Sequence, residues 1–146
     1  MIGSDSDRPV MQEAQTYLSH FGIENELVTA SAHRDPDKVK QLASEAQANG
    51  YGVIITAAGM AAALPGVVSA YSSLPVLGVP LEGGLPGGID ALYSIVQMPA
   101  GLPVGTLAVG KTGARNAAIL AARILALQDQ DVAKKLAAFK ENRYRL

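Results

Sequence analysis

The sequence contains no cysteine and no tryptophan, and only 5% of its 146 residues are aromatic. The lack of cysteine excludes disulfide scaffolds, thiol catalysis and cysteine-based zinc sites. Few aromatic side chains and a formal net charge of −1 argue against stacking on, or electrostatic attraction to, nucleic acid. We therefore expect a protein that handles small molecules or forms structure, with no nucleic-acid partner.

Charged residues and long apolar runs are scarce as well. Only 17% of the residues are charged, against about 25% in an average soluble domain, so we expect additional surface to be buried in an oligomer. No apolar run approaches the roughly 20 residues of a membrane-spanning helix, and Met1–Asp5 does not resemble a signal peptide. These absences predict a cytoplasmic protein that does not associate with membranes.

The apolar pattern predicts a single α/β domain over residues 1–146. Short apolar runs, typical of buried strands, alternate with segments whose apolar residues recur at helical spacing. The strands are expected at residues 26–30, 53–57, 76–79 and 104–109. The last three runs are apolar throughout, which is typical of parallel strands covered on both faces. Asp7 and Asp35 precede Pro9 and Pro36 and are expected to be helix N-caps.

The two ends of the chain carry less regular patterns. Only Met1 and Ile2 precede Gly3, so either the first strand is very short or the chain begins inside a longer reading frame. Residues 113–127 contain only three polar side chains. A helix this apolar is expected to be buried nearly all round, which indicates packing against other subunits. A polar helix is expected to follow over residues 131–143.

Two polar segments stand just before predicted helices. Residues 3–7, Gly-Ser-Asp-Ser-Asp, suit a phosphate through backbone N–H groups and a ribose through carboxylates, or form a plain turn. Residues 31–35, Ser-Ala-His-Arg-Asp, follow a predicted strand at the edge where α/β sheets bind ligands. There His33 is able to transfer protons and Arg34 to bind an anion, unless both belong to a structural network within the loop.

Small residues dominate the segments after two later strands. Residues 57–66 allow backbone amides to approach a ligand closely, or serve tight packing of a helix on a strand. The Gly- and Pro-rich residues 81–88 form a candidate lid or an ordinary connection. The sequence has no Walker loop, no serine-hydrolase elbow and no metal-ligand cluster. Proton chemistry near pH 7 therefore falls most naturally on His33.

Six segments occur together in one order along the chain. They are GSDSD at 3–7, SAHRDPD at 31–37, AAGMAAALPG at 57–66, LPVLGVP at 74–80, SIVQMPAGLPVGTLAVG at 94–110 and GARNAAILAARIL at 113–125. In this combination the chain resembles the PurE family of purine biosynthesis over nearly its whole length. The SIVQMP form is similar to the branch of the family that acts as N5-carboxyaminoimidazole ribonucleotide mutase.

The resemblance implies a three-layer α/β/α sandwich with a central parallel sheet, similar to flavodoxin and Rossmann folds. It also implies assembly as an octamer, with the C-terminal helices packing on neighbouring subunits. The implied substrate is a ribonucleotide, without a metal or an organic cofactor, and His33 is the implied general acid and base. The substrate-binding residues implied by the family motifs are Ser4, Asp5, Asp7, Ser31, Arg34, Gly59 and Leu64.

The sequence departs from the family pattern at two positions. A stretch that usually reads GGAAHLPG reads GMAAALPG here, so Met60 replaces a glycine and Ala63 replaces a second histidine. Two alternatives to the mutase follow. One is an aminoimidazole ribonucleotide carboxylase, and the other is a PurE-like ribonucleotide-binding protein with altered or lost catalysis. A purely structural oligomer is disfavoured, because packing alone does not require these polar segments at strand ends.

Overall fold

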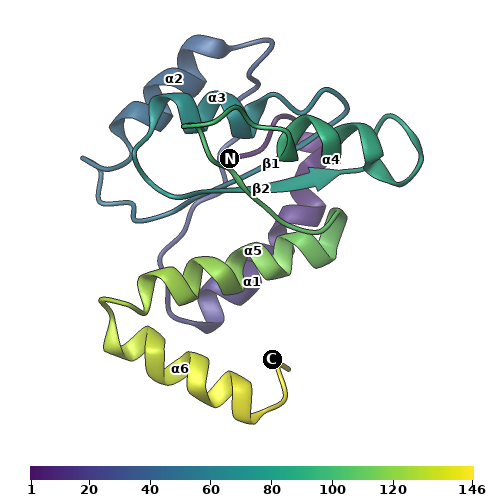
Figure 1. Cartoon of the computed structure of the whole chain (residues 1–146). Coiled ribbons are helices and arrows are strands. Elements are labelled where there is room, and N and C mark those ends of the chain that lie inside the picture. Colours follow the sequence, from purple (N-terminus) through teal and green to yellow (C-terminus); the bar gives the residue numbers. More distant parts are fainter.

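A computed structural model describes all residues, 1–146, and contains one open parallel sheet (Figure 1). Its strands, in spatial order, are β1 (Ile54–Gly59), β2 (Val76–Leu81) and β3 (Gly105–Thr106). β1 and β2 pair over six residues, and every residue of β2 is buried. Burial of a strand along its whole length explains why its sequence is apolar throughout. The parallel α/β architecture predicted from the sequence is confirmed.

Residues 1–3 extend this sheet on the open side of β1. Ile2 bridges both Thr29 and Ala57 in parallel, and its amide donates to the carbonyl of Val28 at 2.9 Å. The predicted strand at 26–30 is reduced to a single bridge, between Thr29 and Ile2. The predicted strand at 104–109 is likewise reduced to the two residues of β3.

Six α-helices and two 3₁₀ turns complete the fold. The helices are α1 (Arg8–His20), α2 (Pro36–Glu45), α3 (Leu64–Tyr71), α4 (Ile89–Val96), α5 (Gly110–Leu125) and α6 (Gln130–Glu141). The turns are η1 (Asp5–Asp7) and η2 (Pro86–Gly88). Figure 1 shows α2, α3 and α4 above the sheet and α1 and α5 below it, with α6 outside α5. The three layers of the predicted sandwich are all present. No helix is both long and apolar enough to cross a membrane.

The core lies on both faces of the sheet. Successive side chains of a strand point to opposite faces, so Leu77 and Val79 of β2 pack with α1 and α5, whereas Val76 packs with α2, α3 and α4. The first cluster is built largely around small alanines of α5, and the second includes Val39 and Ile95. Both faces are thus covered within one subunit.

Helix α5 differs from its prediction. Its buried residues are all small: Gly113, Ala114, Ala117, Ala118, Ala121 and Ala122. Most of them face α1 and β2, whereas Ala122 packs with Phe21 and with Val132 and Phe139 of α6. Arg115 and Asn116 are exposed on the other side, so in the isolated subunit the helix is not buried all round. These small residues permit close approach, since a Cβ on Gly113 would overlap the carbonyl oxygen of Ala108. Leu127, just beyond the helix, is 83% exposed.

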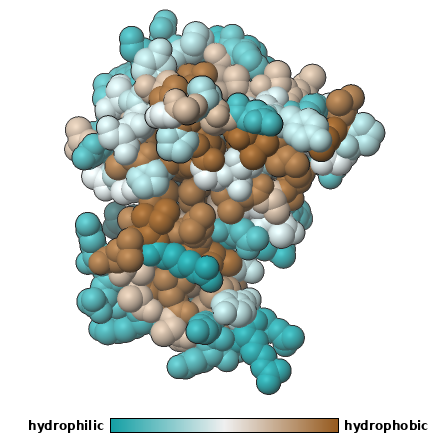
Figure 2. Space-filling view, in the orientation of Figure 1, coloured by the Kyte–Doolittle hydropathy of each residue, from teal (hydrophilic) through white to brown (hydrophobic).

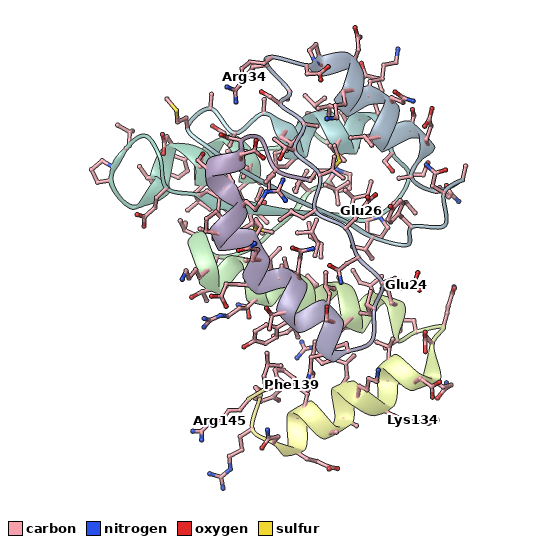
Figure 3. All side chains as sticks on the ribbon, turned by 180° about the vertical axis from the view of Figure 1, so that it is seen from behind. Glu24, Glu26, Arg34, Lys134, Phe139 and Arg145 are labelled. Atoms are coloured by element: carbon pink, nitrogen blue, oxygen red, sulfur yellow. The ribbon has the colours of Figure 1, made fainter.

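Helix α6 packs on the far side of α5 through a small aromatic cluster. Phe139 meets Phe21 edge to face, with 5.3 Å between ring centroids, and Tyr17 at 6.0 Å. Figure 3 shows Phe139 reaching from α6 toward α1. Asp129 caps this helix by accepting from the amides of Asp131 and Val132. The polar C-terminal helix predicted from the sequence is confirmed.

Candidate functional site

A cavity of about 530 Å³ opens at the carboxyl ends of the parallel strands. Four loops line it: residues 3–7, 31–34, 58–64 and 82–83. They follow four neighbouring strand segments of the sheet, and this edge is where open α/β sheets bind ligands. A second cavity, of about 130 Å³, lies under Met1 and Val53 at the opposite ends of the strands and is lined mainly by apolar side chains. The first cavity is the candidate site because polar groups converge on it.

The first loop is held by a reciprocal cap. The amide of Ser4 donates to the carboxylate of Asp7 at 3.1 Å, and the Ser4 hydroxyl accepts from the amide of Ser6 at 3.4 Å. Asp7 therefore closes the turn η1 and makes no side-chain cap on α1, contrary to the prediction. Burial raises the pKa of Asp7, against the opposing effect of the hydrogen bonds from Ser4 and Ser6. Ser4, Ser6 and Asp7 all line the cavity.

Asp5, also predicted to bind substrate, is exposed and does not line the cavity. Its carboxylate accepts from the Thr29 hydroxyl at 2.6 Å and from the Arg8 guanidinium at 3.2 Å. Those two hydrogen bonds hold the pKa of Asp5 below its ordinary value. The structure therefore separates the two aspartates of the Gly-Ser-Asp-Ser-Asp segment, with one facing the cavity and one facing the neighbouring strand segment.

The second loop brings an anion-binding group beside the first. Arg34 donates to the Ser31 hydroxyl and to the carbonyl of Gly3, both at 3.3 Å. These bonds leave other guanidinium N–H groups free for a ligand. Figure 3 shows Arg34 on the loop before α2, away from Glu24 and Glu26 at the other end of that chain segment. His33 is exposed and makes no hydrogen bond, so its ring is free to turn toward a ligand.

Asp35 ends this loop and accepts from the amide of Lys38 at 3.3 Å. It is therefore the N-cap of α2, as predicted from the sequence. The cap fixes where the helix begins and so fixes the position of the loop that carries His33 and Arg34.

Small residues after β1 form the opposite wall. Gly59 passes so close to β2 that a Cβ there would lie 3.2 Å from the carbonyl oxygen of Leu81. Met60 adopts a left-handed backbone, with φ of 56°, and its side chain is 60% exposed. Ala63 and Leu64 complete the wall at the start of α3.

Sequence reasoning missed some cavity-lining residues. Ser6 was passed over within the first segment, and Glu82 was treated only as part of a candidate lid. Of residues 81–88, only Glu82 and Gly83 reach the cavity. Glu82 and Gly83 come directly after the buried parallel strand β2, and this position is the sequence signal that identifies them.

Comparison with known proteins agrees with this geometry. The family model for AIR carboxylase matches residues 1–145. The N5-carboxyaminoimidazole ribonucleotide mutase of Haemophilus influenzae is 51% identical over 142 residues, which cover 97% of this chain and 87% of the relative. This chain belongs to the AIR carboxylase, or PurE, family. The mutase of Thermotoga maritima is 48% identical over 141 residues, covering 97% of this chain and 81% of the relative.

A solved structure supports the PurE fold independently. The crystal structure of Treponema denticola PurE superposes with a TM-score of 0.85 at 29% identity, covering 97% of this chain and 87% of that one. The flavodoxin-like α/β arrangement expected from the resemblance is thus confirmed. The PurE chain described here contains no group of three or more His, Cys, Asp or Glu side chains placed to hold a metal ion.

Met60 should be a source of backbone strain in the candidate site. A left-handed backbone costs a non-glycine residue about 1–2 kcal/mol, whereas glycine loses about 0.5–1 kcal/mol more chain entropy on folding. Met60→Gly is therefore expected to raise the free energy of unfolding by roughly 0.5–1 kcal/mol. Urea denaturation measures this, with Ala61→Gly as the matched control. The control should be destabilised, and equal losses in both variants would contradict the strain.

Asp7 should make stability depend on pH. Because its folded-state pKa is raised, the native state favours the protonated carboxyl, and stability is lost as pH rises through that pKa. Asp7→Asn is expected to be more stable than the parent chain at pH 7, with the difference vanishing below the ordinary pKa of 3.8.

Thermal unfolding between pH 3 and pH 8 tests the effect of Asp7. Asp131→Asn is the control, since this exposed carboxylate lies in the first turn of α6. Its loss should lower stability slightly at pH 7. A variant at Asp7 that loses stability at every pH would contradict the assignment.

Proposed function

We propose that this chain is an N5-carboxyaminoimidazole ribonucleotide mutase. It is an isomerase that moves the carboxylate from the exocyclic nitrogen to C4 of the ring in de novo purine (IMP) biosynthesis. The observation that carries the proposal is the match of about 50% identity, over nearly the whole chain, to relatives with this activity. The cavity supports it, because six of the seven substrate-binding residues implied by the family motifs line it.

The order of the strand segments indicates which end of the substrate lies at which loop of the cavity. Residues 28–30, residues 1–3, β1 and β2 lie side by side, and neighbouring strands are about 4.8 Å apart. The loops at the two ends of this series are therefore about 14 Å apart, a span suited to a mononucleotide. Arg34 belongs to the loop at one end and Gly59 to the wall nearer the other.

In this placement the phosphate lies beside the Arg34 guanidinium and the hydroxyls of Ser4 and Ser31. Charge-assisted bonds from guanidinium to phosphate are stronger than neutral hydrogen bonds. The Asp7 carboxylate accepts from ribose hydroxyls. The imidazole ring lies against the backbone of Gly59 and the side chain of Leu64, which both line the cavity.

His33 supplies the proton transfers that the reaction needs. As the bond from the exocyclic nitrogen to the carboxyl carbon breaks, carbon dioxide forms and the nitrogen takes a proton. C4 of the ring then attacks the carbon dioxide, and the proton on C4 is removed. One imidazole is able to give the first proton and take the second, so the reaction has no net proton change. With Ala63 in place of a second histidine, His33 is the sole imidazole at the cavity.

A wall of mainly small apolar residues beside the ring is proposed to retain the carbon dioxide there. Retaining it spares a second encounter between two molecules, which is a large entropic advantage. Residues 58–64 form this wall. The departures at Met60 and Ala63 fall within it. They favour, as the second candidate, a ribonucleotide-binding protein with altered or lost catalysis. Aminoimidazole ribonucleotide carboxylation remains the alternative activity.

The mutase is tested by incubating purified protein with N5-carboxyaminoimidazole ribonucleotide, without ATP or added bicarbonate, and following the C4-carboxylated isomer. Product is expected from the parent chain. His33→Asn should lower turnover by about 10²–10⁴-fold while aminoimidazole ribonucleotide still binds in calorimetry. The matched control is His20→Asn, at the end of α1, which should keep full activity.

Binding of the ribonucleotide without turnover by the parent chain would favour the second candidate. Product formed only from aminoimidazole ribonucleotide and bicarbonate would favour the carboxylase. Full turnover by His33→Asn would refute the role of His33.

The proposal extends to a homo-oligomer, with an octamer expected from the family. Exposed apolar side chains on α4 support it, since Tyr93 is 62% and Val96 is 50% exposed. Figure 2 shows further apolar surface at the level of α5. Apolar surface of this kind commonly marks protein interfaces.

The native mass in solution should therefore be a multiple of the 15.1 kDa chain mass, and eight times that mass for an octamer. Light scattering after gel filtration measures it. Val96→Glu should lower the mass if α4 lies in the interface, whereas the charge reversal Glu45→Lys, at the exposed end of α2, should not. A monomer at micromolar concentration would overturn the expected assembly.

A further inference from the structure

Thr29 is the meeting point of several polar contacts behind the candidate site. Its hydroxyl donates to the Asp5 carboxylate at 2.6 Å and accepts from the Arg8 guanidinium at 3.0 Å. The same guanidinium donates to the Leu27 carbonyl at 3.3 Å and to Asp5 at 3.2 Å. The ammonium group of Lys38, on α2, donates to the Thr29 carbonyl at 2.9 Å. The turn η1 and helices α1 and α2 are thus joined at one residue.

Arg8 does not face the cavity. It is half-buried, it is absent from the cavity lining, and its bonds are directed toward Leu27, Thr29 and Asp5. Its guanidinium has three protein acceptors: Leu27 and Thr29 on the neighbouring segment, and Asp5 on η1.

Few backbone contacts join the two segments behind these loops. Residues 1–3 and 28–30 share a single bridge, between Ile2 and Thr29. A ladder this short defines the spacing of two segments weakly compared with the six-residue pairing of β1 and β2. Yet the loops that follow these two segments carry the groups proposed to hold the phosphate and ribose. Side chains behind the loops are therefore in the position to set their spacing.

We propose that Arg8, Asp5 and Thr29 form a positioning junction that holds the Ser4–Asp7 loop and the Ser31–Arg34 loop at the spacing required by the ribonucleotide. The inference rests on the proposed function for the identity of the ligand. It reassigns Asp5 from a substrate-binding residue to a structural partner of Arg8. Arg8 acts through the loops and does not contact the substrate.

A double-mutant cycle between Arg8→Met and Thr29→Val tests the junction. The probe is aminoimidazole ribonucleotide, with its dissociation constant measured by calorimetry. Each single change is expected to weaken binding by about tenfold, and the double variant by little more than either, because both break one unit. For N5-carboxyaminoimidazole ribonucleotide, KM should rise similarly with kcat within about twofold, since His33 is untouched. Arg8→Lys should restore part of the affinity.

Two controls separate this role from others. Arg115→Met removes a similar exposed pair, with Glu13 of α1 at 3.1 Å, on the other side of that helix. It should leave the dissociation constant unchanged. Arg34→Met removes the proposed phosphate ligand itself and should weaken binding more than Arg8→Met does. Exposed ion pairs contribute only about 0–1 kcal/mol to stability, so all of these variants should fold.

Amide hydrogen exchange provides a readout that needs no ligand. Arg8→Met and Thr29→Val should each speed exchange in both loops, residues 3–7 and 31–34, with no further increase in the double variant. Multiplicative losses of affinity in the cycle, or unchanged exchange in the 31–34 loop, would overturn the junction. Failure of the parent chain to bind the ribonucleotide would refute the proposed function, and the exchange data would still decide the junction.

Discussion

The parallel pairing of β1 with β2 is the interaction on which the rest of the molecule depends. Every residue of β2 is buried, so both of its faces must be covered by helices before the pairing is stable. Covering both faces requires crossover helices, and these return each strand in the same direction. The carboxyl ends of all strand segments therefore lie at one edge, where residues distant in sequence share one cavity.

The fold also requires some segments of the chain to pack at very short distances from one another. Gly59 passes against Leu81, and most of the small buried residues of α5 pack against α1 and β2. At Met60 the chain takes a left-handed turn that glycine would make without strain. Strain stored at a site wall is a recurrent feature of functional sites. Here it falls in the wall proposed to hold the imidazole, at a position where the family usually has glycine.

The polar side chains that line the cavity differ in how firmly the protein holds them. Arg34 is fixed to both neighbouring loops through Ser31 and Gly3, so its guanidinium is already oriented for an anion. Asp7 is partly desolvated, which raises its pKa against the opposing effect of its hydrogen bonds with Ser4 and Ser6. The His33 side chain makes no hydrogen bond to the protein. A fixed cation and a mobile imidazole suit binding and proton transfer respectively, which is the division of labour the proposed reaction requires.

The sequence by itself determined the alternation of strands and helices and the segments that supply the site. These depend on local patterns: an apolar run buried on both faces, a cap such as Asp35, and short polar motifs at strand ends. Tertiary structure decided the rest. It left residues 26–30 with one bridge, exposed one side of α5, turned Asp5 away from the cavity and brought Arg8 to Thr29. Each of these outcomes depends on which segments become neighbours in space, and a local pattern holds no information about partners that lie far away along the chain.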